Sequence, residues 1–399
     1  MRSALLIAAT LVVVVANLAS AAVLQHRIIH RESKRFRMMR EGTWKAYVEK
    51  MDARRISLAK ELLLGRGGVL ASLPQAVSDY EDFEGSANLW VPDTSCRANG
   101  CAPKNHYNAS LSSTAVANGQ PWYGDAQSDD AKIVRSIQYE TGFANGTLVQ
   151  DTVALLGSDG TSSLAIPNTV FGQASTISTD LGEDPADGIL GLAFTSLAVD
   201  GVVPPVIQAI QEGLLDQPLF TVYLEHRGAL DGVYGGLFTY GAVDTTNCGP
   251  VVAYQPLSSA TFWQYSVNGF SIGNYSYNKR QDTISDTGTS LLVGPVAQVM
   301  AIGQAAGAPF DETVGALVID CNATPPDLLI TIGANTYAIT AVNMVVELDT
   351  DLCAYGAYPF DQSGLGAAWT FGTPFLRQWC NILDVGQQQI GFAPSLQDA

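Results

Sequence analysis

One short polar segment constrains the fold of this chain more than any other. Residues 285–290 read Ser-Asp-Thr-Gly-Thr-Ser and lie between two stretches of apolar and β-branched residues. This pattern predicts a strand, a tight turn and a second strand. Gly288 lets the backbone turn tightly, and the hydroxyls of Thr287 and Thr289 can hold Asp286 in place. A β-turn with a solvated aspartate fits the segment equally well, so the rest of the chain must decide.

The composition predicts a mainly β protein with two parts. The chain has 399 residues, 47% of them apolar, which suits two domains or one large domain in two lobes. From Ala71 onward, short alternating runs are separated by Gly, Thr and Ser. Two helices are predicted at residues 205–215 and 296–306, with proline near the first turn, where its missing N–H costs little. A short echo between residues 187–192 and 369–372 indicates duplicated lobes.

The first 21 residues have the pattern of a secretory signal peptide. Arg2 precedes an apolar core over residues 4–16, and residues 19–21, Ala-Ser-Ala, form a small-residue cleavage site. The alternative is a membrane anchor, because the apolar run reaches Leu24, but Asn17 and the many alanines would make a poor span. We therefore expect a secreted or endo-lysosomal protein that is free of the membrane after cleavage.

An even set of cysteines and four glycosylation sequons agree with the secretory route. Six cysteines in a secreted chain imply disulfides. Asn-x-Ser/Thr sequons mark surface positions in secreted proteins, although each is weak alone. The cysteines are Cys96, Cys101, Cys248, Cys321, Cys353 and Cys380, and the sequon residues are Asn108, Asn145, Asn274 and Asn322.

Charge divides the chain into a basic leader and an acidic body. Residues 22–66 hold 12 Lys and Arg against 5 Asp and Glu, whereas residues 67–399 hold 8 against 33. Opposite charges attract, so we expect the leader to pack on the body, in helical or irregular form over residues 26–64. Residues 65–68 are expected to form a hinge. The alternative of a nucleic-acid-binding arm does not suit a secreted chain.

No pattern predicts a metal or cofactor. The four histidines, His26, His30, His106 and His226, are scattered along the chain. No glycine-rich phosphate loop lies between a predicted strand and a predicted helix.

Around Asp286, the order of motifs resembles that of the pepsin-like aspartic proteases. Residues 88–92, Asn-Leu-Trp-Val-Pro, resemble the strand that follows the first catalytic turn of the family. Residues 139–142, Tyr-Glu-Thr-Gly, resemble the flap tip. The resemblance therefore implies that Tyr139, Thr141 and Gly142 belong to the flap and that Trp90 lies by the cleft. The remaining matches, in order, are Cys96 with Cys101 and residues 187–192, 262–264, 371–372, 375–378 and 390–393.

The resemblance implies a mainly β, bilobal double-β-barrel fold with a cleft between the lobes. It divides the chain into a signal peptide (1–21), a basic propeptide (22–70), an N-terminal lobe (71–215) and a C-terminal lobe (216–399). The implied activity is peptide-bond hydrolysis at acid pH, in which two aspartates share one proton and activate a water. The implied partners are peptide or protein substrates in the cleft and the protein's own propeptide, and the implied state is a monomer.

The resemblance also implies which cysteines pair. It suggests Cys96 with Cys101 and Cys321 with Cys353, which leaves Cys248 with Cys380. The last two are therefore expected to lie near each other in the second lobe, with Cα atoms no more than about 7 Å apart.

The basic leader resembles the inhibitory propeptide of the family. Its cations would pair with carboxylates of the body at neutral pH. Below about pH 4 those carboxylates gain protons and the pairing fails. Acid would then release the leader, with cleavage near residues 65–72.

The sequence departs from the family pattern at the first catalytic turn. The family reads Asp-Thr-Gly-Ser there. Gly85 and Ser86 are present, but Phe83 and Glu84 stand where Asp and Thr belong. Roughly twenty residues, a hairpin and the strand leading to the aspartate, are absent before Gly85 by comparison with the family. Glu84 and Asp82 are not expected to substitute, because a one-residue slip in a strand turns a side chain to the other face.

Three interpretations of this gap stay open. The chain can be the precursor of an aspartic endopeptidase whose complete product contains the missing block, so that the given sequence is a gene-model or splicing artefact. It can instead be a non-catalytic relative that binds peptides in its cleft. The third interpretation is a product that does not fold. In each, Asp286 is the one aspartate of the pair that remains, and we expect this form to be inactive.

Overall fold

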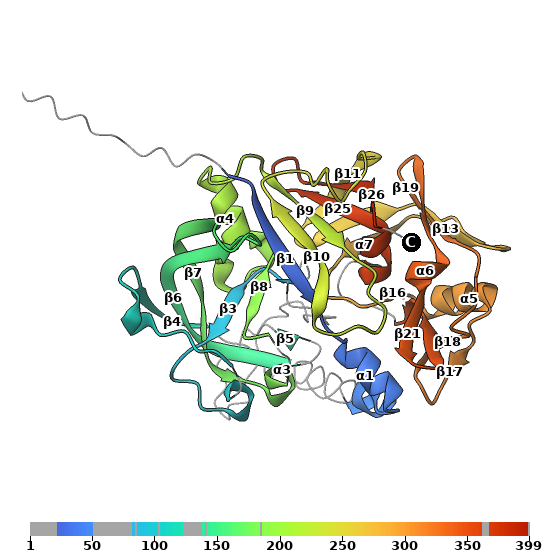
Figure 1. Ribbon diagram of the computed structural model, residues 1–399, viewed down its shortest axis with the longest axis horizontal. Helices are drawn as coiled ribbons and strands as arrows, with labels where there is room; N and C mark the ends of the chain where they lie inside the picture. Colours follow the sequence, from blue (N-terminus) through green and yellow to red (C-terminus); the bar gives the residue numbers. More distant parts are fainter. Residues whose placement is uncertain are drawn as a thin grey trace, which may run out of the picture.

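The computed structural model describes residues 22–50, 82–83, 86–102, 104–122, 138–139, 142–183, 186–360 and 367–397. The predicted signal peptide, the predicted hinge at residues 65–68, Gly85 and Thr141 lie outside these residues. The protein is mainly β, as the sequence predicts, and its described strands form four sheets. The strands of residues 82–191 gather at one side of the molecule and those of residues 253–397 at the other (Figure 1).

The first lobe is built on a seven-stranded sheet. Its longest pair, β6 and β7, forms an antiparallel hairpin of two 15-residue strands. The rings of Trp90 and Trp122 pack against each other in its core, with centroids 6.3 Å apart. The strands in sheet order are β2 (Asp82–Phe83), β8 (Ile189–Gly191), β3 (Leu89–Pro92), β7 (Ser163–Ile177), β6 (Gly142–Leu156) and β4 (Val116–Trp122), and β5 (Gln138–Tyr139) pairs with β6.

An eleven-stranded sheet forms the centre of the molecule and most of the second lobe. Its strands in order are β1 (Leu24–His30), β10 (Val233–Tyr240), β9 (Leu219–Leu224), β25 (Trp379–Asp384), β26 (Gln389–Pro394), β11 (Ala253–Ala260), β12 (Trp263–Val267), β15 (Gln281–Ser285), β24 (Trp369–Phe371), β16 (Leu292–Gly294) and β23 (Ala357–Pro359). The indole N–H of Trp263 donates to the carbonyl of Leu192, 3.0 Å away, and so joins the two lobes.

Two four-stranded sheets complete the second lobe. The first has the order β14 (Tyr275–Tyr277), β13 (Gly269–Ile272), β19 (Leu328–Ile332) and β20 (Asn335–Ile339), and the second β17 (Phe310–Asp311), β18 (Ala316–Ile319), β22 (Leu352–Tyr355) and β21 (Val345–Asp349). Among the described residues, no sheet closes into a barrel, and β5 branches from β6 in the first-lobe sheet. The predicted lobe boundary at residues 215/216 stays a prediction.

Both predicted helices form, and glycines end them. Helix α5 (Val296–Ala306) has the predicted bounds, and Gly307 caps it with φ of 79°. Helix α4 (Pro205–Gln211) begins at the predicted residue but ends before the predicted residue 215, because Gly213 takes the left-handed φ of 68°. The other helices are α1 (Lys34–Arg40), α3 (Thr179–Gly182), α6 (Ala341–Met344), α7 (Thr373–Gln378) and the 3₁₀ turns η1 (Asn99–Cys101), η2 (Ala109–Leu111), η3 (Thr195–Leu197) and η4 (Val199–Gly201).

The leader begins with a strand, which corrects the prediction of a helical or irregular segment. Strand β1 pairs antiparallel with β10, from Leu24 opposite Tyr240 to His30 opposite Val233. The reason is tertiary: the edge of β10 offers unpaired backbone groups, and β1 satisfies them. Helix α1 and a helical segment at residues 44–50 follow, and both lie at the second lobe (Figure 1).

The leader packs on the acidic body, as its charge predicts. Phe36, Met39 and Trp44 are buried in a cluster with residues of the second lobe. Around them, leader cations pair with body carboxylates: Lys45 with Glu312 at 3.1 Å, Arg31 with Asp231 at 3.8 Å and Lys34 with Glu183 at 4.0 Å. Apolar burial holds the leader in place, because exposed ion pairs contribute little.

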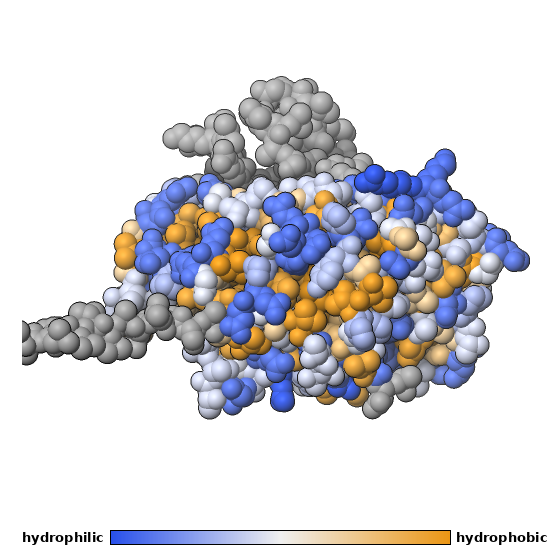
Figure 2. Space-filling model, turned by 90° about the horizontal axis from the view of Figure 1, so that it is seen from above, coloured by the Kyte–Doolittle hydropathy of each residue, from blue (hydrophilic) through white to orange (hydrophobic). Residues whose placement is uncertain are grey.

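The three predicted disulfides are confirmed. The Cα–Cα distances are 6.0 Å for Cys96–Cys101, 6.1 Å for Cys248–Cys380 and 5.1 Å for Cys321–Cys353. No helix in the described ranges is long and apolar enough to cross a membrane. On the face shown in Figure 2, hydrophilic side chains are interspersed with smaller hydrophobic patches.

The disulfides should differ in their effect on stability. The Cys248–Cys380 pair closes a loop of 132 residues, against 5 for Cys96–Cys101. Replacing Cys248 and Cys380 together by alanine should lower the free energy of unfolding by about 2–5 kcal/mol, because the longer loop gives the unfolded chain more freedom. Urea unfolding of this variant and of the matched Cys96/Cys101 variant tests the prediction, and equal losses would contradict it.

Candidate active site

The turn that carries Asp286 is held by a strand inserted between its two arms. Strand β24 runs parallel to β15 and antiparallel to β16. Its last residue, Phe371, lies opposite Ser285 on one side and Leu292 on the other. The Asp286 N–H donates to the Phe371 carbonyl at 3.0 Å. Both ends of the turn are therefore fixed to one strand.

Donors from the turn itself orient the Asp286 carboxyl. Asp286 is only 3% exposed. One carboxyl oxygen accepts from the Gly288 N–H at 3.1 Å, and the other from the Thr289 hydroxyl at 2.7 Å. Thr287 and Ser290 are also buried. Gly288 and Thr289 thus contact the Asp286 carboxyl, and their role in supporting a catalytic turn stays a prediction.

Residues from the end of the chain support the turn from behind, and the sequence analysis did not identify them. The Ser285 hydroxyl donates to the Asn381 side chain at 2.6 Å. Thr373 donates its N–H to the Thr289 carbonyl at 2.8 Å and its hydroxyl to the Ser290 carbonyl at 3.0 Å. A Cβ at Gly372 would collide with the Thr289 carbonyl. Thr373 directly follows Phe371 and Gly372, which resemble the closing segment of the family. This position is the signal in the sequence that could have identified it.

The first lobe repeats this arrangement of three strands. Strand β8 lies between β2 and β3, parallel to the first and antiparallel to the second. The Gly191 N–H donates to the Asn88 carbonyl at 3.1 Å, as the Gly372 N–H donates to the Leu291 carbonyl at 3.2 Å. The echo predicted between residues 187–192 and 369–372 is therefore confirmed as a repeat of topology.

The register of the two repeats aligns Phe83 with Asp286. Leu190 lies opposite Asp82 and Leu89, just as Phe371 lies opposite Ser285 and Leu292. In both lobes the two residues that pair with the middle strand are seven positions apart. They are Asp82 and Leu89 in the first lobe, and Ser285 and Leu292 in the second. The residue after Ser285 is Asp286, and the residue after Asp82 is Phe83. Phe83 thus has the position in the first lobe that Asp286 has in the second.

The other described first-lobe residues that were predicted at the site are Ser86, Trp90, Tyr139 and Gly142. Ser86 is buried, and its carbonyl accepts from the Ala193 N–H at 2.7 Å. In the segment predicted to form the flap, Tyr139 lies opposite Gly142 in the antiparallel pairing of β5 and β6. Trp90 was predicted by the cleft, and the structure places its ring in the buried first-lobe core.

The sequon residues differ in accessibility. Asn274 and Asn322 are exposed, whereas Asn108 and Asn145 are half-buried. The Asn108 side chain accepts from the Ser110 N–H at 3.1 Å and hydroxyl at 2.7 Å, at the start of η2. Within the described ranges, no group of three or more His, Cys, Asp or Glu side chains is arranged to hold a metal ion.

The buried contact between Ser285 and Asn381 gives a test of the support behind the turn. Ser285→Ala and Asn381→Ala should each destabilise the protein by about 1–3 kcal/mol, because each leaves a buried polar partner unsatisfied. The double variant should lose less than the sum, with a coupling of about 0.5–3 kcal/mol. Chemical unfolding of the four proteins measures the coupling, and strict additivity would show that the hydrogen bond contributes nothing.

Comparison with known proteins shows that most of the chain is similar to aspartic proteases. The profile of eukaryotic aspartyl proteases matches residues 82–395. The chain is 49% identical to Aspartic protease 6 of Caenorhabditis elegans over 403 aligned residues, covering 96% of this chain and 98% of that protein. It is 36% identical to Aspartic protease 2 of Necator americanus, covering 90% and 92%. It is 31% identical to Cathepsin D of Dictyostelium discoideum, covering 78% of each chain.

Proposed function

The chain belongs to the pepsin-like aspartic protease family, and from this premise we propose that it is an endopeptidase precursor whose 399-residue form cannot complete catalysis. The complete enzyme would hydrolyse peptide bonds at acid pH in the cleft between its lobes. The observation that carries the proposal is the strand register that aligns Phe83 with Asp286.

The mechanism needs both carboxyl groups. One removes a proton from the attacking water while the other, sharing the remaining proton, polarises the peptide carbonyl. Asp286, with its two ordered donors, supplies one half of this pair. The phenyl ring of a phenylalanine can neither accept nor donate a proton. Losing a general acid or base costs about 10²–10⁴-fold or more in rate.

The alignment with the nematode relative supports a missing block. It spans 403 positions, yet 96% of this chain's 399 residues is about 383. About 20 aligned positions therefore carry no residue of this chain. That number agrees with the hairpin and strand expected before Gly85.

A non-catalytic peptide binder is the second candidate. The flap hairpin of Tyr139 and Gly142 and the complete Asp286 turn favour it, because both remain in place without the first aspartate. In both candidates the chain enters the secretory route, is glycosylated at its sequons, acts as a monomer and carries residues 22–70 as a propeptide. The three disulfides support an oxidising compartment.

Restoring the block tests the proposal. The corresponding residues of the C. elegans relative, inserted between Glu84 and Gly85, should give pepstatin-sensitive hydrolysis of a fluorogenic peptide at pH 3–5. The unmodified chain should be at least about 100-fold slower, because it lacks one carboxyl of the pair. Asp286→Asn in the restored form is the control and should return the rate to background.

Two outcomes would change the assignment. Pepstatin-sensitive turnover by the unmodified chain at the rate of the restored form would contradict the predicted inactivity. Tight binding of pepstatin to the unmodified chain without turnover, measured by calorimetry, would favour the peptide binder.

A further inference from the structure

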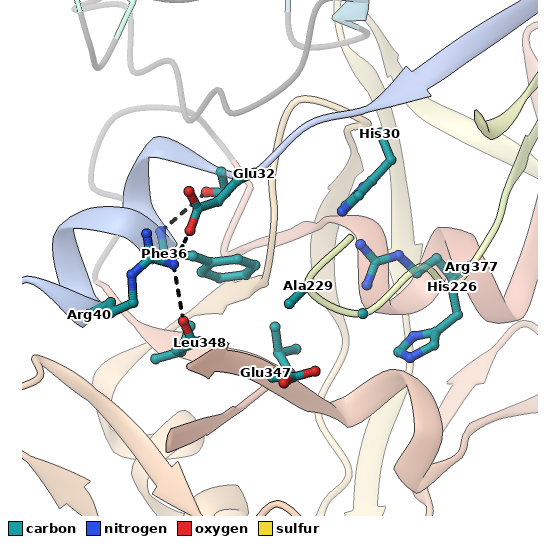
Figure 3. A pocket seen from close by; sticks show the side chains of 12 residues that line it. His30, Glu32, Phe36, Arg40, His226, Ala229, Glu347, Leu348 and Arg377 are labelled. Carbon is teal, nitrogen blue, oxygen red and sulfur yellow. Dashed lines mark hydrogen bonds and ion pairs between the residues drawn. The ribbon is translucent and has the colours of Figure 1, made fainter. Parts of the chain in front are cut away.

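A pocket lies where the leader meets the second lobe (Figure 3). The end of β1 and the start of α1 form one wall, with His30 and Phe36. The loop after β9 contributes His226, β21 contributes Glu347, and α7 contributes Arg377. The pocket therefore exists only while the leader is docked.

Three basic side chains gather at one end of this pocket. Arg377 is 5% exposed and His30 is 8% exposed. Figure 3 shows the His30 ring and the Arg377 guanidinium side by side, with His226 next to them. Nδ1 of His226 is enclosed and has no hydrogen-bond partner among the described residues. No described carboxylate forms an ion pair with Arg377.

The two histidines can share this space with Arg377 only when they are neutral. Burial, and then the charge of Arg377, lower the pKa of His30 from 6.5 to about 4, although the Gly228 backbone and Asp231 partly oppose this. Burial and Arg377 also lower the pKa of His226. At pH 7 both rings are therefore uncharged, and Arg377 is the single charge of the three.

We propose that His30, His226 and Arg377 form an acid sensor that undocks the leader. Protonation of the two histidines places three positive charges in one pocket, where His30 and Arg377 are buried and His226 is half-buried. Their repulsion, together with the cost of burying each charge, drives β1 and α1 away from the second lobe. This inference rests on the proposed function, in which the leader is a propeptide.

The direction of the pH effect follows from proton linkage. Once undocked, His30 is in water and regains a pKa near 6.5, whereas docked it has a pKa of about 4. The undocked state binds more protons between these values, so docking weakens as pH falls from 6.5 to about 4. For each histidine, a fall of one pH unit in this window lowers the docking equilibrium constant by up to tenfold. Over the whole window, the decrease for His30 is roughly two orders of magnitude.

Other charged groups also face the pocket, and several of them form ion pairs. The charged groups facing the cluster are Arg31, Glu32 and Arg40 on the leader, Glu225, Arg227 and Asp231 beside β9, Glu347 on β21 and Arg377 on α7. Arg40 pairs with Glu32, and Arg227 with Glu225.

Hydrogen exchange of the β1 amides in the intact chain tests the sensor. After correction for intrinsic exchange, protection of Leu24–His30 should fall at least tenfold between pH 6.5 and pH 4.5. The double variant His30→Gln/His226→Gln should keep its protection nearly constant over this range, whatever its protection at pH 7. His30→Gln alone should show a shallower fall than the unmodified chain.

Two controls separate the sensor from general weakening of the leader. His26 lies on the same strand, but its ring contacts the Leu156 carbonyl outside the pocket. The variant His26→Gln should therefore keep the full pH dependence. Lys45→Met removes the pair with Glu312 and should lower protection by a similar factor at every pH. An unchanged pH dependence in the double histidine variant, or a flat profile in the unmodified chain, would overturn the proposal.

Failure of the sensor and failure of the proposed function give different results. The exchange measurement needs no catalysis. If β1 loses protection as expected but the restored form hydrolyses no peptide, the enzyme assignment fails alone. If the restored form is an active protease inhibited by its leader, yet β1 shows no histidine-dependent fall, the sensor fails alone.

Discussion

Strand β24 holds the turn of Asp286 in place in the second lobe. Its three residues pair with β15 on one side and β16 on the other, and the Phe371 carbonyl accepts from the Asp286 N–H. The turn is attached at both ends, and two donors within it, Gly288 and Thr289, help to orient its carboxyl. The segment that follows, Gly372 and Thr373, then closes the turn from behind.

The same plan in the first lobe shows what the proposed missing block would remove. Strand β8 still lies between β2 and β3, so the backbone scaffold of a second turn survives. Its register nevertheless brings Phe83 to the place of the aspartate. Under the proposed function, the chain retains the duplicated architecture while the paired chemistry is incomplete, because architecture depends on many backbone contacts and chemistry on one side chain.

The leader is bound by several kinds of interaction that respond differently to pH. Backbone pairing of β1 with β10 and burial of Phe36, Met39 and Trp44 do not depend on protons. Exposed ion pairs such as Lys45 with Glu312 add to these contacts. In the proposed sensor, the histidines beside Arg377 weaken docking as the pH falls. A leader held this way would be bound near neutrality and would loosen during acidification.

The sequence by itself determined the features that depend on neighbouring residues or on a recognisable motif order. These include the strand-turn-strand around Asp286, helix α5 between Pro295 and Gly307, the mainly β class and the disulfide pairs. Only the tertiary structure decided that the leader starts as a strand, that Asn381 supports Ser285 and that His30 meets Arg377. Each of these joins residues far apart in the chain. Their local sequence carries no signal for such contacts, because an edge strand or a buried polar partner is defined by what packs against it.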